Sequence, residues 1–275
     1  MKALILAEWE RLFKRKLTWI VLAMAPAGLL VAASYLQKQN GQLSPDLPEY
    51  TFTGNFAVLG LSEMLFTAFN ALLLVFITLM ITEEYRTGQL RMVMIRARSM
   101  GELVVAKTTV LLGFLLLFYI VYFLSSYVIG FLLFDNPTQY PVFHHKELVS
   151  FKEGFFYNVM FYSWAYVTTV AVGAVLVFIA VISKTTTTAI GGGIGFLLLS
   201  FSCPYVLKVF SPWMDPIIFA KVFFMSVPMI QLEGITTMIA EKPQFILWNT
   251  GVLCFYILFF GTLTFLTLRK KETFL

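Results

Sequence analysis

Long apolar runs, separated by short polar segments, are the dominant pattern of this 275-residue sequence. A helix needs about 20 predominantly apolar residues to cross the hydrocarbon core of a bilayer. The strands of a membrane barrel would instead alternate polar and apolar residues, and none of these runs alternates in that way. We therefore predict an all-α integral membrane protein with one transmembrane domain over residues 1–275. The six predicted spans are about 17–36, 62–81, 108–134, 155–182, 186–207 and 245–268.

The composition supports lipid rather than water as the solvent of this chain. Hydrophobic residues make up 59% of the sequence and charged residues 13%, whereas about a quarter of a soluble domain is charged. The mean hydropathy is +0.82. Cys203 and Cys254 lie in or beside apolar runs, so we favour buried free thiols over a disulfide between them.

The segment before the first span, residues 1–16, is predicted to form an amphipathic helix on the membrane surface. Its apolar side consists of Ile5, Trp9, Leu12 and Phe13. Glu10 and Lys14 are spaced to form an i, i+4 ion pair. The alternative is a plain positively charged flank of the first span, and the sequence leaves both open.

The segment 208–242 is predicted to form a re-entrant hairpin on the outer side. It is mostly apolar, but Pro212, Pro216 and Pro228 interrupt it. The uninterrupted pieces are too short to span a bilayer. A helical hairpin that enters the outer leaflet without crossing it satisfies both observations.

Basic residues are distributed unevenly between the two sides of this topology. Loops on the cytoplasmic side are typically enriched in Lys and Arg, so we expect both termini in the cytoplasm. That orientation places 14 of the 20 basic residues inside: Lys2, Arg11, Lys14, Arg15, Lys16, Arg86, Arg91, Arg96, Arg98, Lys107, Lys184, Arg269, Lys270 and Lys271. The positive charge therefore indicates membrane orientation, and no nucleic-acid-binding module accompanies it.

The sequence contains no motif of catalytic chemistry among those we sought. No Gly is followed by Lys, which excludes a Walker A loop in this chain. His144 and His145 lack the i, i+4 spacing of a zinc-binding helix, so no metal is predicted. We also expect no buried acid–base pair. Asn70, near the middle of the second span, either lines a pathway or bonds to a neighbouring helix, and we favour the second reading.

The cytoplasmic connection 83–103 stands out because it is long and charged between two apolar spans. Glu83 and Glu84 suit a helix N-terminus, and Arg96 and Arg98 suit a C-terminus. An apolar stripe at helical spacing is formed by Leu90, Val93, Met94 and Ala97. Such a helix could bind in a groove of a soluble partner. The alternative is a solvated, positively charged loop at the lipid head groups.

The stretch EEYRTGQLRMVMIRARSMGELVVAK, residues 83–107, resembles the segment that follows the second span in permeases of type-2 ATP-binding-cassette (ABC) exporters. The positions that carry the resemblance are Glu84, Gly88, Gln89, Leu90, Ser99, Glu102 and Lys107. The likeness extends to the basic amphipathic N-terminus, the six spans and the apolar outer hairpin.

The resemblance implies an ATP-driven exporter in which this chain supplies the membrane pathway. It implies a second permease chain, identical or related, and two copies of an ATPase subunit that hold ATP and Mg, with no cofactor on this chain. The connection would be a coupling helix that contacts the ATPase through Glu84, Arg86, Gly88, Gln89, Leu90, Arg91, Val93, Met94, Ala97 and Arg98.

The implied location is a bacterial cell membrane, and the implied cargo is amphipathic or lipid-like: an antibiotic peptide, drug, lipid or glycan. The alternatives are a secondary transporter and a membrane sensor or scaffold. A secondary transporter would usually carry intramembrane charges and paired broken helices, which the sequence does not indicate.

Overall fold

The computed structural model describes residues 1–87, 100–183 and 185–272. Within them, six helices are long and apolar enough to cross a membrane, which confirms the predicted number of long apolar helices. Backbone N–H and C=O groups have no water to bond in lipid, so an apolar run of this length satisfies them internally by forming a helix. The fold is helical apart from one short strand pair that we did not predict.

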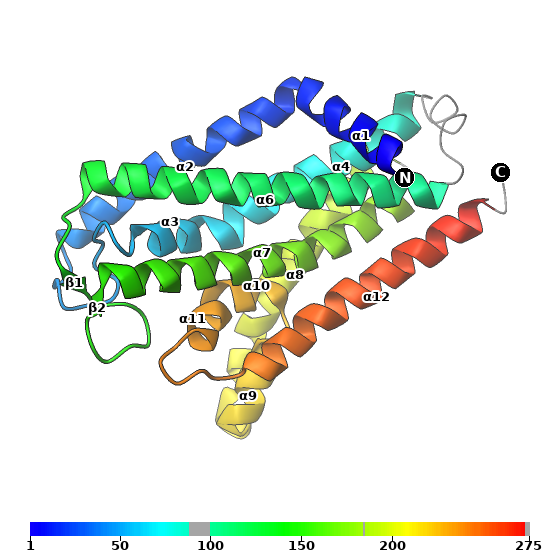
Figure 1. The fold of residues 1–275 in the computed structure, drawn as a ribbon. Helices are drawn as coiled ribbons and strands as arrows, with labels where there is room; N and C mark the ends of the chain where they lie inside the picture. The colour runs from blue at the N-terminus through cyan, green and yellow to red at the C-terminus, as the bar shows by residue number, and fades with distance from the viewer. Residues whose placement is uncertain (88–99, 184, 273–275) are drawn as a thin grey trace.

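The six long helices form one bundle in which α6 and α7 lie side by side, α2 and α12 are inclined to them, and α8 crosses α7 at a steep angle (Figure 1). They are α2 (Lys16–Asn40), the continuous series α3 (Phe56–Met64), η1 (Leu65–Phe69) and α4 (Asn70–Thr87), then α6 (Met100–Leu133), α7 (Phe151–Ile182), α8 (Thr186–Phe210) and α12 (Ile246–Glu272). η1 is a π-helical turn, a local irregularity that is frequent at functional positions of membrane and soluble helices.

Short elements fill the segments between the long helices. They are α1 (Lys2–Lys14), β1 (Gln139–Tyr140), β2 (Val149–Ser150), η2 (Ser211–Trp213), α9 (Pro216–Phe223), α10 (Val227–Met229), η3 (Ile230–Gly234) and α11 (Ile235–Met238). Strands β1 and β2 pair antiparallel. The pieces Pro216–Phe223 and Val227–Met238 form one pair of helices bent by 108°, at the place where the prolines predicted an interruption.

Side-chain caps set the starts of two spans. The Ser150 hydroxyl accepts from the backbone N–H of Glu153 while the Glu153 carboxylate accepts from Ser150, which is a capping box at the start of α7. Thr185 and Thr188 form the same arrangement at the start of α8. The run of threonines after the short turn therefore caps the next helix, as the sequence indicates.

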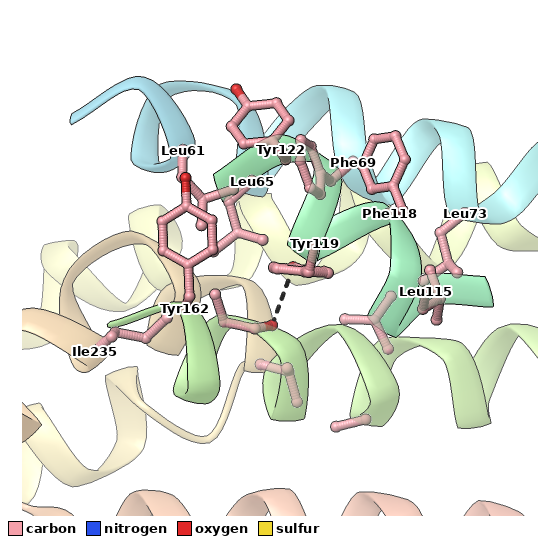
Figure 2. Packing of buried hydrophobic residues seen from close by; sticks show 14 of the residues in the cluster. Leu61, Leu65, Phe69, Leu73, Leu115, Phe118, Tyr119, Tyr122, Tyr162 and Ile235 are labelled. Carbon is pink, nitrogen blue, oxygen red and sulfur yellow. Dashed lines mark hydrogen bonds between the residues drawn. The ribbon is translucent and has the colours of Figure 1, made fainter. Parts of the chain in front are cut away.

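The core lies where η1, α4, α6 and α7 meet. α2 packs along α6, α12 along α7, and α4 against both α7 and α8. Figure 2 shows the rings of Phe69, Phe118 and Tyr122 together near the start of α4, with Tyr119 directed toward α7. The Tyr119 hydroxyl bonds to the Thr169 hydroxyl at 2.6 Å, so a tyrosine is accommodated in an apolar core because its polar end has a partner.

Two long helices remain largely uncovered within the chain. Only 12% of the apolar window of Thr186–Trp213 and 17% of that of Ile246–Lys270 is buried, against 61% for α7. Figure 1 shows α12 inclined to α6 and α7, with its C-terminal end close to the start of α6, and both termini lie at the same end of the bundle. α8 and α12 therefore present apolar surface to lipid or to another chain.

Candidate coupling site and its supports

The predicted coupling residues fall at the junction between α4 and α6. Glu84 and Arg86 lie on the last turns of α4, which continues to Thr87, and their side chains lie outside the described residues. The other eight predicted residues also lie outside them: Gly88, Gln89, Leu90, Arg91, Val93, Met94, Ala97 and Arg98. Helix α6 begins at Met100, so both ends of the predicted connection 83–103 are helical.

A buried ion pair and a hydrogen bond from the same ammonium group join α1, α4 and α6 near the ends of this connection. The Lys107 ammonium on α6 donates to the Glu8 carboxylate on α1 at 3.1 Å and to the carbonyl of Met80 on α4 at 3.3 Å. The side chains of Lys107 and Glu8 are only 5% and 4% exposed. The Arg11 guanidinium, on α1 as well, donates to the other Glu8 oxygen at 3.1 Å.

This pair corrects the expectation that no acid and base would be buried together. Glu8 was missed because only the large apolar residues of the first helix were counted. At 100° per residue, Glu8 falls beside Ile5 and Leu12 on the apolar side of the helix. A carboxylate on that side must find a cation when the side is buried, and Lys107, surrounded by apolar residues in the sequence, supplies it.

Apolar contacts reinforce the attachment of α1 to α6. Leu4 packs against the buried Leu103. Trp9 crosses α6 at Gly113, where an added Cβ would come within 3.0 Å of the indole. Glycine at this position therefore permits a close approach that a larger residue would oppose. The helix predicted for residues 1–16 is present as α1, and its apolar side faces α2 and α6 in this chain. Its position on the membrane surface stays a prediction.

The joint between α1 and α2 is fixed by two hydrogen bonds. The chain is extended at Arg15, so the last carbonyls of α1 lose their helical partners. The Thr18 hydroxyl donates to the carbonyl of Leu12 at 2.5 Å, and the Trp19 indole donates to that of Phe13 at 2.9 Å. The angle between α1 and the first span is therefore specified by side chains of α2.

A further contact connects the C-terminal end of α4 to α8. The hydroxyls of Thr82 and Thr186 lie 2.9 Å apart, and Thr82 also donates to the carbonyl of Thr78 at 2.7 Å. Thr186 is the first residue of α8. The end of α4 thus contacts α6 and α8 through polar groups, and Lys107 of α6 extends this link to α1, so a displacement of α4 would reach all three helices.

Asn70 lies at the opposite end of α4 and is completely buried. Its amide nitrogen donates to the Gln231 side chain at 2.7 Å and to the carbonyl of Phe66 at 3.0 Å. Gln231 is in η3 of the bent pair, and both partners lie at π-helical turns. Asn70 therefore bonds to a neighbouring element, the reading favoured from sequence, and a role in lining a pathway stays a prediction.

Gln231 escaped the sequence analysis because the segment was judged by its prolines and its apolar residues. The amide itself could have indicated the contact, because a single amide side chain in an apolar segment within the membrane needs a hydrogen-bond partner. Asn70 and Gln231 are two such amides. Pairing each with the other would have predicted that the bent pair packs on the second span.

No group of three or more His, Cys, Asp or Glu side chains lies close enough to hold a metal in the part of the chain that the structure describes. His144 and His145 are in the loop between β1 and β2, on the outer side of the predicted topology. They border a cavity of about 330 Å³ together with Glu241 and Lys242 of the segment before α12.

These features define a polytopic membrane protein whose first helix, second span and third span are tied together at one end. A comparison with protein families matches residues 4–145, just over half of the chain, to the ABC-2 family transporter proteins. The chain belongs to this family, whose members are membrane permeases without an ATPase domain. No curated protein matches the chain in a sequence search.

Proposed function

We propose that this ABC-2 permease is the membrane subunit of an ATP-driven exporter, coupled to a separate ATPase through the helix 84–98. Permeases of the family generally pair with ATPase subunits. The observation that carries the proposal is the buried contact of Lys107 with Glu8 and Met80. Met80 and Lys107 lie about two helical turns before and after the stretch 88–99. A force that a partner applies to this stretch would therefore act on the helices that the contact joins.

The mechanism that this arrangement supports is a rigid-body movement. ATP-driven closure of the two ATPase subunits would displace the coupling helix, and with it the joined ends of α4 and α6. The buried ion pair would carry α1 along, and the contact of Thr82 with Thr186 would carry α8. Movement of packed helices as units is the usual way in which a small displacement is transmitted through a core.

A pathway formed by two permease chains is supported by the uncovered apolar surface of α8. An amphipathic or lipid-like cargo agrees with walls of that kind. The cargo proposal therefore depends on the apolar surface and on the family's usual substrates.

The proposed orientation places both termini in the cytoplasm. The uneven distribution of Lys and Arg supports it. The two termini lie at one end of the bundle (Figure 1), as an even number of crossings requires. Family membership favours an ATP-driven permease over the secondary transporter and the sensor that the sequence left open.

The test is assembly with the ATPase subunit. Leu90→Asp or Met94→Asp places a charge on the apolar stripe, and an unpaired charge in an interface costs a few kcal/mol. A loss of about 2 kcal/mol weakens association roughly thirty-fold. The matched control is Arg91→Ala, which removes a charge beside the stripe and should weaken association much less.

Co-purification of the ATPase and ATP hydrolysis by the complex are the measurements. The two Asp variants should insert into the membrane at wild-type levels because Leu90 and Met94 lie outside the spans. Full assembly and full ATP hydrolysis with both variants would show that the connection is a solvated loop, and the coupling proposal would be abandoned.

A further inference from the structure

An apolar groove of about 280 Å³ lies between α6, α7 and α12. Its walls consist of aliphatic side chains, glycines, one Phe and three threonines. The hydroxyls of Thr109 and Thr264, two of those threonines, donate to carbonyls of their own helices at 2.8 Å. The groove therefore offers almost no hydrogen bonds, and water has little reason to occupy it.

The groove is open at the surface of the bundle, and its length is close to the thickness of one leaflet. Val105 on α6 and Phe265 on α12 flank it and are 47% and 55% exposed. On α6 it runs from Gly101 to Leu115, which is about 20 Å at 1.5 Å per residue. One leaflet of the hydrocarbon core is roughly 15 Å thick, so the groove has the length of an extended acyl chain.

A second cavity, of about 400 Å³, adjoins the groove at the end of the bundle that holds both termini. It shares Gly101, Val105, Phe265 and Leu268 with the groove and is also bordered by Glu102 and Arg269. Lys270 follows on α12 and is exposed. With two basic residues and one acidic residue, this mouth carries a net positive charge at the depth of the head groups.

We propose that this groove binds an anionic phospholipid of the leaflet on the side of the chain termini. One acyl chain lies between α6, α7 and α12, and the phosphate is held near Arg269 and Lys270. The charge of the mouth complements the head group, and the apolar walls complement the chain. The lipid would stabilise the position of α12 beside α6 and α7. The inference does not depend on the cargo or on the coupling proposal.

Two glycines of α12 provide a matched pair of variants. A Cβ added at Gly261, which lines the groove, would meet no atom within 4 Å, so Gly261→Leu extends into the space proposed for the acyl chain. A Cβ at Gly251 would also meet no atom within 4 Å, but Gly251 lies outside the groove. Both substitutions replace glycine by the same helix-forming residue, so only the occupied groove distinguishes them.

The experiment measures binding of phosphatidylglycerol and of phosphatidylcholine to the purified full chain by native mass spectrometry. Gly261→Leu should weaken phosphatidylglycerol binding by about tenfold or more, because it displaces at least two buried methylenes, while Gly251→Leu should bind as the wild type does. Arg269→Gln should weaken phosphatidylglycerol binding by about fivefold and leave phosphatidylcholine binding unchanged. Arg269 is exposed, so this variant tests the site without altering the packed core.

Three results would overturn the proposal. Unchanged phosphatidylglycerol binding by Gly261→Leu would show that the acyl chain does not occupy the groove. Equal effects of Arg269→Gln on the binding of the two lipids would show that the mouth does not recognise the anionic head group. Efficient cross-linking in membranes between Val105→Cys of one copy and Phe265→Cys of another would show that a second copy covers the groove instead.

Discussion

Breaking the ion pair between Glu8 and Lys107 should weaken the attachment of α1 to the bundle. Substituting Glu8 and substituting Lys107 should weaken it to different extents. Glu8→Leu removes the carboxylate that accepts from Lys107 and leaves the ammonium, whose side chain is 5% exposed, with the neutral carbonyl of Met80 in place of a charged partner. Lys107→Met leaves the Glu8 carboxylate with its bond from Arg11. We therefore expect Glu8→Leu to be the more damaging single substitution.

The magnitude follows from the burial of both groups. Removing one partner of a buried pair costs about 3–5 kcal/mol, whereas replacing both by apolar residues of similar volume is often neutral. We expect about 3 kcal/mol for Glu8→Leu, less for Lys107→Met, and close to zero for the double variant. A cost of 3 kcal/mol corresponds to more than a hundred-fold change in the docking equilibrium of α1.

Limited proteolysis measures that equilibrium directly. Trypsin cleaves after basic residues, and Arg15 lies in extended backbone between α1 and α2. Cleavage of a locally opened segment follows the population of the open form when opening is fast. The cleavage rate at Arg15 should therefore rise steeply in Glu8→Leu, rise less in Lys107→Met, and return toward the wild-type rate in the double variant.

The exposed pair of Glu10 and Lys14 is the matched control. It lies on the same helix, its atoms are 4.0 Å apart, and its side chains are 72% and 81% exposed. Such an i, i+4 pair contributes at most about 0.5 kcal/mol, so Glu10→Gln should change cleavage little. If Glu8→Leu were cleaved no faster than Glu10→Gln, the buried pair would not hold α1, and the proposed transmission to α1 would fail.

Three further predictions concern other parts of the chain. Asn70→Leu should cost about 1–2 kcal/mol because it leaves the buried Gln231 amide unpaired, and Asn70→Leu combined with Gln231→Leu should cost less than the sum of the single changes, measured by thermal unfolding in detergent. Gly154→Ala should cost about 2 kcal/mol in the same assay, because its Cβ would overlap the hydroxyl of the buried Tyr140, whereas Gly28→Ala, in open space, should cost nothing. A C-terminal tag should resist protease added to intact cells if the bent pair does not cross the membrane, and its digestion would indicate a seventh span.

The sequence by itself determined the membrane environment, the six long helices and the interruption near the prolines. These follow from local rules: the length of an apolar run, the backbone requirement for internal hydrogen bonds, and the missing N–H of proline. The stretch 83–107 was also sufficient to indicate the family, which the match to residues 4–145 confirms. The predicted side-chain roles in that stretch remain predictions.

The tertiary structure alone decided which polar residues meet. Glu8 and Lys107 are 99 residues apart, and Asn70 and Gln231 are 161 apart. In an apolar core each of these groups must have a partner, but the identity of the partner depends on how the helices pack. Periodicity within one helix carries no information about the face that a distant helix presents. The groove between α6, α7 and α12 could not be predicted for the same reason, because its walls come from three helices that are separate in the sequence.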